Sequence, residues 1–142
     1  MSQENVEIVR RVAEAFNRSD VAAMVEEHDP DVEWHPAMQT SLGGEATVYR
    51  GHEGLRAMMR DFYEVFAEIH VDVSEIRDIG DRAVLIGRLR VRGKESGVET
   101  ESPAAYVVDL GNSKVIQVRT YLDPSVALEA VGLSEQDAHA DS

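Results

Sequence analysis

The chain contains no cysteine, and this absence excludes two kinds of structure. Neither a disulfide bond nor a zinc site with thiolate ligands can form. Small secreted domains usually depend on disulfides, so a reducing compartment is the natural setting for this chain. Its 142 residues are enough for one domain that buries roughly two-thirds of the surface exposed by the unfolded chain.

The sequence also lacks a long apolar run and an apolar leader. A helix that crosses a bilayer needs about 20 mainly apolar residues, and no stretch of this chain approaches that length. Residues 1–5 carry neither the basic nor the apolar segment of a secretory signal. We therefore expect a cytoplasmic protein without a membrane partner.

Basic residues are scarce relative to acidic ones. The chain has 14 Lys and Arg against 27 Asp and Glu, which gives a formal net charge of -13 at pH 7. This charge repels the phosphates of nucleic acids and the anionic lipids of membranes, so neither is an expected partner. Its simplest role is to keep the protein soluble.

In the first part of the chain, apolar residues recur every three or four positions, which is typical of helices that bury one side. The predicted helices span residues 5–17, 21–28 and 51–66. Asp29-Pro30-Asp31 is expected to end the second of them. A brief strand over 32–36 and a loop over 37–50 follow it, and we expect the loop to lie over an opening.

Alternating apolar and polar residues dominate the rest of the chain and predict four strands, over residues 69–77, 82–92, 98–110 and 114–121. Short turns join them as antiparallel hairpins. Asp123 is expected to cap a last helix that ends near Val131, and residues 134–142 to fray. The order predicts an α+β fold with three N-terminal helices packed on a curved antiparallel sheet, as a single domain over 1–142.

The strand over 84–92 divides its side chains between two faces. One face carries Leu85, Leu89 and Val91, and the other carries Val84 and Ile86 followed by Arg88, Arg90 and Arg92. A face that changes from apolar to cationic either leaves the core for solvent or enters a pocket that holds an anion. The sequence leaves both alternatives open.

Five short segments occur in an order that is similar to one known family. They are Phe16-Asn17-Arg18-Ser19-Asp20, Asp31-Val32-Glu33-Trp34, Tyr49-Arg50-Gly51-His52-Glu53-Gly54-Leu55, Gly93 with Ser96-Gly97-Val98, and Thr120-Tyr121-Leu122-Asp123. With the predicted elements, they resemble the SnoaL-like family of the nuclear transport factor 2-like superfamily. This resemblance implies a cone in which helices and the concave sheet face enclose a deep apolar pocket, while the convex face often forms a dimer.

The resemblance also implies which side chains line that pocket and bind a small molecule. They are Phe16, Trp34, Phe62, Arg88, Arg90, Ala104, Tyr106, Val118 and Thr120. Arginine keeps its charge in any cavity, so Arg88 and Arg90 need anions there. Either Glu99 and Glu101 or an anionic ligand would supply them.

The catalytic residues of the related enzymes must be compared with this sequence one position at a time. The three that act in ketosteroid isomerases fall on Val12, Trp34 and Ala104, none of which can replace them. Of the limonene epoxide hydrolase groups, Arg88 matches the arginine. The aspartate base of the polyketide cyclases has no assigned position on the concave face.

The remaining groups of that hydrolase branch are not matched. Its two aspartates fall on Arg90 and Thr120, and its tyrosine and asparagine fall on Val32 and Trp34. Of that hydrolase set, only the arginine is therefore retained.

His35 and His52 lie near the expected pocket mouth, and histidine carries protons near neutral pH. The candidate catalytic residues are His35 as base and Arg88 as an electrostatic group. Glu33 and Glu53 are near these histidines in sequence, but we do not expect preformed pairs. No metal or other cofactor is expected, because no histidines have the spacing of a zinc pair.

Three functions remain open at this point. The first is a protein that binds a partly apolar molecule, either neutral or anionic. The second is a cofactor-free isomerase, cyclase or hydrolase, and the third is a dimeric association module whose cavity is filled by its own side chains. We also expect a homodimer through the outer sheet face, where Leu85, Leu89 and Val91 would need cover.

Overall fold

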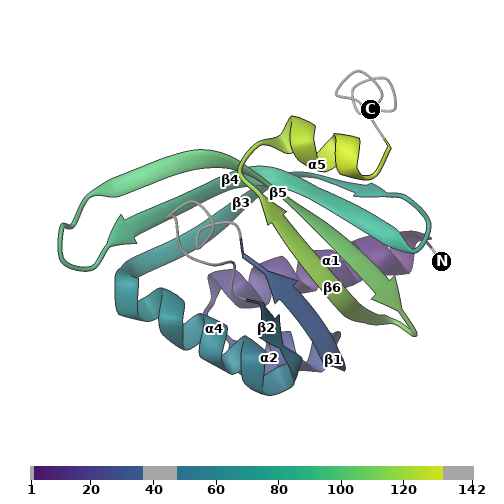
Figure 1. Cartoon of the computed structure of the whole chain (residues 1–142), viewed down its shortest axis with the longest axis horizontal. Helices are drawn as coiled ribbons and strands as arrows, with labels where there is room; N and C mark the ends of the chain where they lie inside the picture. The colour runs from purple at the N-terminus through teal and green to yellow at the C-terminus, as the bar shows by residue number, and fades with distance from the viewer. Residues whose placement is uncertain (1, 37–47, 133–142) are drawn as a thin grey trace.

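The computed structural model describes residues 2–36 and 48–132, and its helices lie on both sides of one sheet (Figure 1). The helices are α1 (Ser2–Asn17), α2 (Val21–Glu27), α4 (Gly51–Val65) and α5 (Pro124–Ala130). The strands are β1 (His28–His35), β2 (Tyr49–Arg50), β3 (Phe66–Asp78), β4 (Arg82–Gly93), β5 (Glu99–Gly111) and β6 (Lys114–Tyr121). The predicted tail over 134–142 and most of the predicted loop lie outside the described residues.

The strands form one sheet in the order β2-β1-β6-β5-β4-β3. The hairpins from β3 to β6 are antiparallel, as predicted, but β1 runs parallel to β6. The α+β fold class is as predicted, but the sheet is mixed and not antiparallel throughout. A parallel pair needs a long connection, and here helix α4 and the whole meander separate the two strands in sequence.

Strand β1 starts earlier than the sequence predicts. It begins at His28, directly after α2, so Pro30 lies inside a strand and does not separate two elements. The pairing of β1 with β6 is irregular between His28 and Glu33. Proline is tolerated at such an irregularity because its missing N–H interrupts no regular ladder there. The short strand β2 was predicted as part of the loop.

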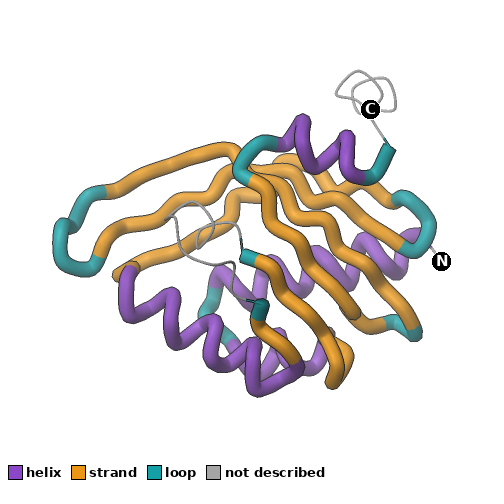
Figure 2. The backbone as a smooth tube through the Cα atoms, viewed as in Figure 1, coloured by secondary structure: helices purple, strands orange, loops and turns teal. Residues whose placement is uncertain are grey.

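Helices α1, α2 and α4 cover the concave face of the sheet, and α5 covers part of the convex face (Figure 2). The apolar side of α1 is buried, as its periodicity predicts, and Asp20 caps α2 by accepting a hydrogen bond from the backbone N–H of Ala23 at 3.1 Å. No helix within the described ranges is both long and apolar enough to cross a membrane.

The two faces of β4 are the reverse of the predicted ones. Leu85 and Leu89 point to the concave side and belong to the main core, whereas Arg88 and Arg90 point to the convex side. The apolar start of the convex face, at Val84, lies under α5. This face therefore leaves the core for solvent, which is the first of the two alternatives. The expected homodimer loses its motive, because Leu85 and Leu89 are already covered, and stays untested.

Asp123 caps helix α5, as predicted. Its carboxylate accepts hydrogen bonds from the Ser125 hydroxyl at 2.7 Å and the Ser125 backbone N–H at 3.0 Å, and these bonds lower the pKa of Asp123. We expect Asp123→Ala to lower the melting temperature by a few degrees. Asp123→Asn can still cap the helix, so its melting temperature should stay close to that of the wild type. Calorimetry of both variants checks this. Equal melting temperatures for Asp123→Ala and the wild type would contradict the capping role.

Candidate binding pocket

A pocket lies between helix α1 and the concave face of the sheet. Helix α1 contributes Val9, Val12, Ala13 and Phe16. The strands contribute Trp34, Val71, Leu85, Tyr106, Val108, Val115 and Val118. The space that the centre of a water-sized sphere can occupy is about 40 Å³. One water needs roughly 10–15 Å³ on this measure, so the pocket has room for a few waters and is narrow for an organic ligand.

Trp34 forms one wall of this pocket and is held from behind by a buried histidine. Its indole N–H donates to Nε2 of His28 at 3.0 Å. Because Nε2 must accept, Nδ1 carries the proton and donates to the carbonyl oxygen of Met24 at 2.6 Å. Burial lowers the pKa of His28 from 6.5 to about 4, so the ring is neutral at pH 7. The single polar group of Trp34 is thus already bonded and is not offered to a ligand.

Tyr106 lies on the pocket wall beside Trp34, with the two ring centroids 6.4 Å apart. It brings the one ionisable group among the described lining residues. Burial alone raises the pKa of its hydroxyl well above the ordinary value, so the hydroxyl stays protonated at neutral pH. Thr120 lies opposite Tyr106 on β6, and its Oγ1 is buried without a hydrogen-bond partner among the described residues.

Four of the predicted ligand-binding residues, Phe16, Trp34, Tyr106 and Val118, line the pocket. Phe62 lies behind Phe16, with the rings edge to face at 6.4 Å. Whether any of them binds a ligand stays a prediction.

The predicted inward position of Arg88 and Arg90 is wrong. Arg88 Nε lies 2.5 Å from Glu101 Oε1, and Arg90 Nε lies 3.0 Å from Asp72 Oδ2. The hydrogen bond from Arg90 lowers the pKa of Asp72. The pairing predicted for the arginines holds for Glu101, while an aspartate on β3 takes the place of Glu99. Both arginines are partly exposed, so water screens these pairs.

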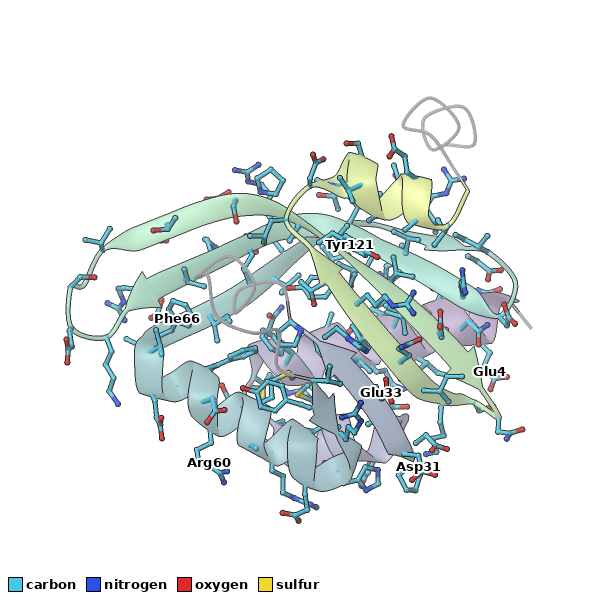
Figure 3. All side chains as sticks on the ribbon, in the orientation of Figure 1. Glu4, Asp31, Glu33, Arg60, Phe66 and Tyr121 are labelled. Carbon is cyan, nitrogen blue, oxygen red and sulfur yellow. The ribbon has the colours of Figure 1, made fainter. Side chains whose placement is uncertain are left out.

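His35, the predicted base, lies on the convex face. Its Nε2 is 3.3 Å from Glu33 Oε1 and 3.3 Å from the Gln117 side-chain amide; Figure 3 labels Glu33 on β1. The expectation that Glu33 and His35 are not preformed as a pair is wrong, because residues two apart share a strand face. Since Trp34 points to the pocket, its neighbour His35 points away from it.

His52 is also occupied outside the pocket. Its Nε2–H donates to the backbone carbonyl of His28 at 2.9 Å, which ties the start of α4 to β1. Within residues 2–36 and 48–132, no three His, Asp or Glu side chains come together in a way that could hold a metal ion.

Several lining residues were missed in the sequence. Val9 and Leu85 both belong to periodic apolar patterns, which predict burial. For Leu85, however, the pattern does not say which of the two strand faces meets the helices. The sequence contains only a weak indication that His28, which supports Trp34, is buried. It continues the apolar stripe of the predicted second helix beyond Met24.

Comparison with known proteins agrees with this fold. The SnoaL-like domain matches residues 9–118, so the chain belongs to the SnoaL-like family. No curated protein matches the chain.

Solved structures are similar over most of their length. One is a nuclear transport factor 2-like protein of unknown function from Burkholderia pseudomallei, with 25% identity, a TM-score of 0.75, and coverage of 91% of this chain and 98% of that one. TerC, co-crystallised with polyporic acid, has 22% identity, a TM-score of 0.75 and coverage of 89% and 96%. A candidate SnoaL-like polyketide cyclase from Jannaschia sp. CCS1 has 21% identity, a TM-score of 0.71 and coverage of 92% of both chains.

Proposed function

We propose that the protein binds a small, neutral and largely apolar molecule in the pocket between α1 and the sheet. The chemistry of the lining carries this proposal, because every described lining side chain except Tyr106 is apolar. An anion would lose its hydration there without gaining a charged partner, since Arg88 and Arg90 lie on the other face. The ligand is therefore neutral rather than anionic.

Binding rather than acid–base catalysis fits the described lining. A general base must lie within hydrogen-bond reach of the proton that it removes. His35 is on the opposite face, and the Tyr106 hydroxyl is held protonated by burial. The fold itself supports an organic ligand, because TerC was crystallised with polyporic acid. In this chain, a ligand larger than a few heavy atoms would have to move lining side chains, since the free space is about 40 Å³.

The test uses nitrobenzene and benzoate, which have nearly the same shape and differ in charge. Trp34 is the one tryptophan in the chain, so its indole N–H gives a single NMR resonance on the pocket wall. We expect nitrobenzene to shift this resonance saturably and benzoate to bind at least about tenfold more weakly, which corresponds to about 1.4 kcal/mol of desolvation. Equal affinities would contradict a neutral ligand, and no shift with either compound would contradict the pocket.

A substitution that fills the pocket shows whether nitrobenzene binds inside it. Ala13 lines the pocket, so Ala13→Leu should abolish the shift caused by nitrobenzene while the protein stays folded by circular dichroism. Ala22 lies on the exposed side of α2, and Ala22→Leu is the matched control with unchanged binding. Binding that survives Ala13→Leu would put the ligand elsewhere.

A further inference from the structure

We infer that a second site binds a small carboxylate with an apolar body, in a groove between the start of α2 and helix α4. This α2–α4 groove is lined by Ser19, Val21, Arg56, Met59, Arg60 and Tyr63. It shares no lining residue with the pocket between α1 and the sheet. Binding in the groove is therefore separate from the proposed function and does not depend on it.

The floor of the α2–α4 groove is apolar. Met59 is 3% exposed, and Val21 and the ring of Tyr63 are partly buried around it. An apolar body that covers these side chains leaves water together with them, which favours binding in proportion to the area covered. The centre of a water-sized sphere can occupy about 380 Å³ in the groove, against about 40 Å³ in the pocket. A chain of several carbon atoms therefore fits without moving side chains.

Two arginines give the groove a positive charge. Arg56 and Arg60 are four residues apart on α4, so they lie on the same side of the helix. Arg60 is exposed, makes no ion pair among the described residues and extends from α4 away from the sheet (Figure 3). Arg56 donates one hydrogen bond at 2.9 Å to Glu53, whose side chain is 91% exposed. Because a guanidinium has five N–H donors, both arginines can still bind a carboxylate.

Two hydroxyls also line the groove and add a donor. Ser19 Oγ lies 2.6 Å from the Tyr63 hydroxyl, and neither side chain makes another hydrogen bond among the described residues. This bond uses one of the two hydroxyl hydrogens, so the other remains able to donate. A carboxylate only accepts hydrogen bonds, so it can accept from this hydroxyl as well as from the arginines.

The size of the groove favours a small molecule over a protein partner. Stable protein–protein interfaces take about 20–30 residues from each side, whereas six residues line this groove. The formal net charge of -13 repels a multiply charged anion at long range, so a single carboxylate fits better than a phosphate. The apolar floor selects a carboxylate that carries a hydrocarbon chain.

The test compares hexanoate with hexanamide, which has the same length and no charge. The protein carries ¹³C-labelled methionine methyl groups, so Met59 reports on the groove while the Trp34 indole N–H reports on the pocket. We expect hexanoate to shift the Met59 resonance saturably and to bind about fivefold more tightly than hexanamide, since exposed ion pairs are modest in energy. Acetate lacks the apolar body and should bind at least about tenfold more weakly than hexanoate.

Arginine variants locate the bound carboxylate. Arg60→Gln should remove the preference for hexanoate over hexanamide. Arg10→Gln changes the net charge by the same amount, but Arg10 lies on α1 and does not line the groove, so this variant should keep the preference. An unshifted Met59 resonance, equal affinities for the two compounds, or a preference that survives Arg60→Gln would overturn the carboxylate site. A Met59 resonance that moves with protein concentration alone would also overturn it, because a second copy would then occupy the groove.

Discussion

Replacing Gly87 by alanine is expected to destabilise the protein by about 3 kcal/mol or more, the upper range for inserting a methyl group into a packed interior. Gly87 is buried on β4, opposite Val73 of β3. A Cβ at this position would lie 2.1 Å from the backbone carbonyl oxygen of Asp72. A backbone atom cannot rotate away as a side chain can, so β3 would have to move. Urea unfolding of Gly87→Ala measures the loss.

The matched control for this prediction is Gly111→Ala, near the end of β5. A Cβ there meets only the side chain of Ile116, at 3.7 Å, which is ordinary contact. We expect its stability to stay within about 0.5 kcal/mol of the wild type, as for substitutions away from packed features. If Gly87→Ala behaves like Gly111→Ala, the close approach of β3 and β4 at this point is wrong.

The second large effect is a loss of stability below neutral pH that depends on His28. In the folded protein, burial lowers the pKa of His28 from 6.5 to about 4. Between these values the unfolded chain binds a proton that the folded protein does not, so stability falls as the pH falls from about 6.5 to 4. The shift of the His28 pKa lowers the free energy of unfolding by about 3 kcal/mol in total, and about 2 kcal/mol of this loss occurs between pH 7 and pH 5. Above pH 7 the histidine contributes no pH dependence.

Denaturant unfolding at pH 7 and pH 5 tests this linkage. His28→Gln is expected to be less stable than the wild type at pH 7, because Trp34 and Met24 lose their partner, but to lose about 2 kcal/mol less on going to pH 5. His70→Gln, at a half-exposed position, is the control and should keep the wild-type difference. A His28→Gln variant with the same pH dependence as the wild type would contradict the buried neutral ring.

Protonation of His28 has a further consequence for the pocket. A proton on Nε2 removes the acceptor for the Trp34 indole N–H. The wall next to Tyr106 would then lose its support, so the pocket and the stability of the domain depend on the same histidine. The hydrogen bonds that Arg11 donates to the Glu27 carboxylate lower the pKa of Glu27, and their loss adds to the destabilisation only at lower pH.

The sequence by itself determined the elements and the family. The periodicity of α1, the cap at Asp123 and the hairpins from β3 to β6 depend on neighbours within a few residues, so they could be predicted from local patterns. The positions of Phe16, Trp34, Tyr106 and Val118 on the concave side followed from the family resemblance.

Only the tertiary structure decided which face of β4 is buried. Alternation separates Leu85 and Leu89 from Arg88 and Arg90, but either set could have faced inward until the contacts with the remote helices were known. The same holds for the parallel pairing of β1 with β6 and for the bond between His28 and Trp34. The contacts of β4 with the helices and of β1 with β6 join segments that are far apart in the sequence. The cost of burying a charge is what leaves the two arginines outside and keeps the buried His28 neutral.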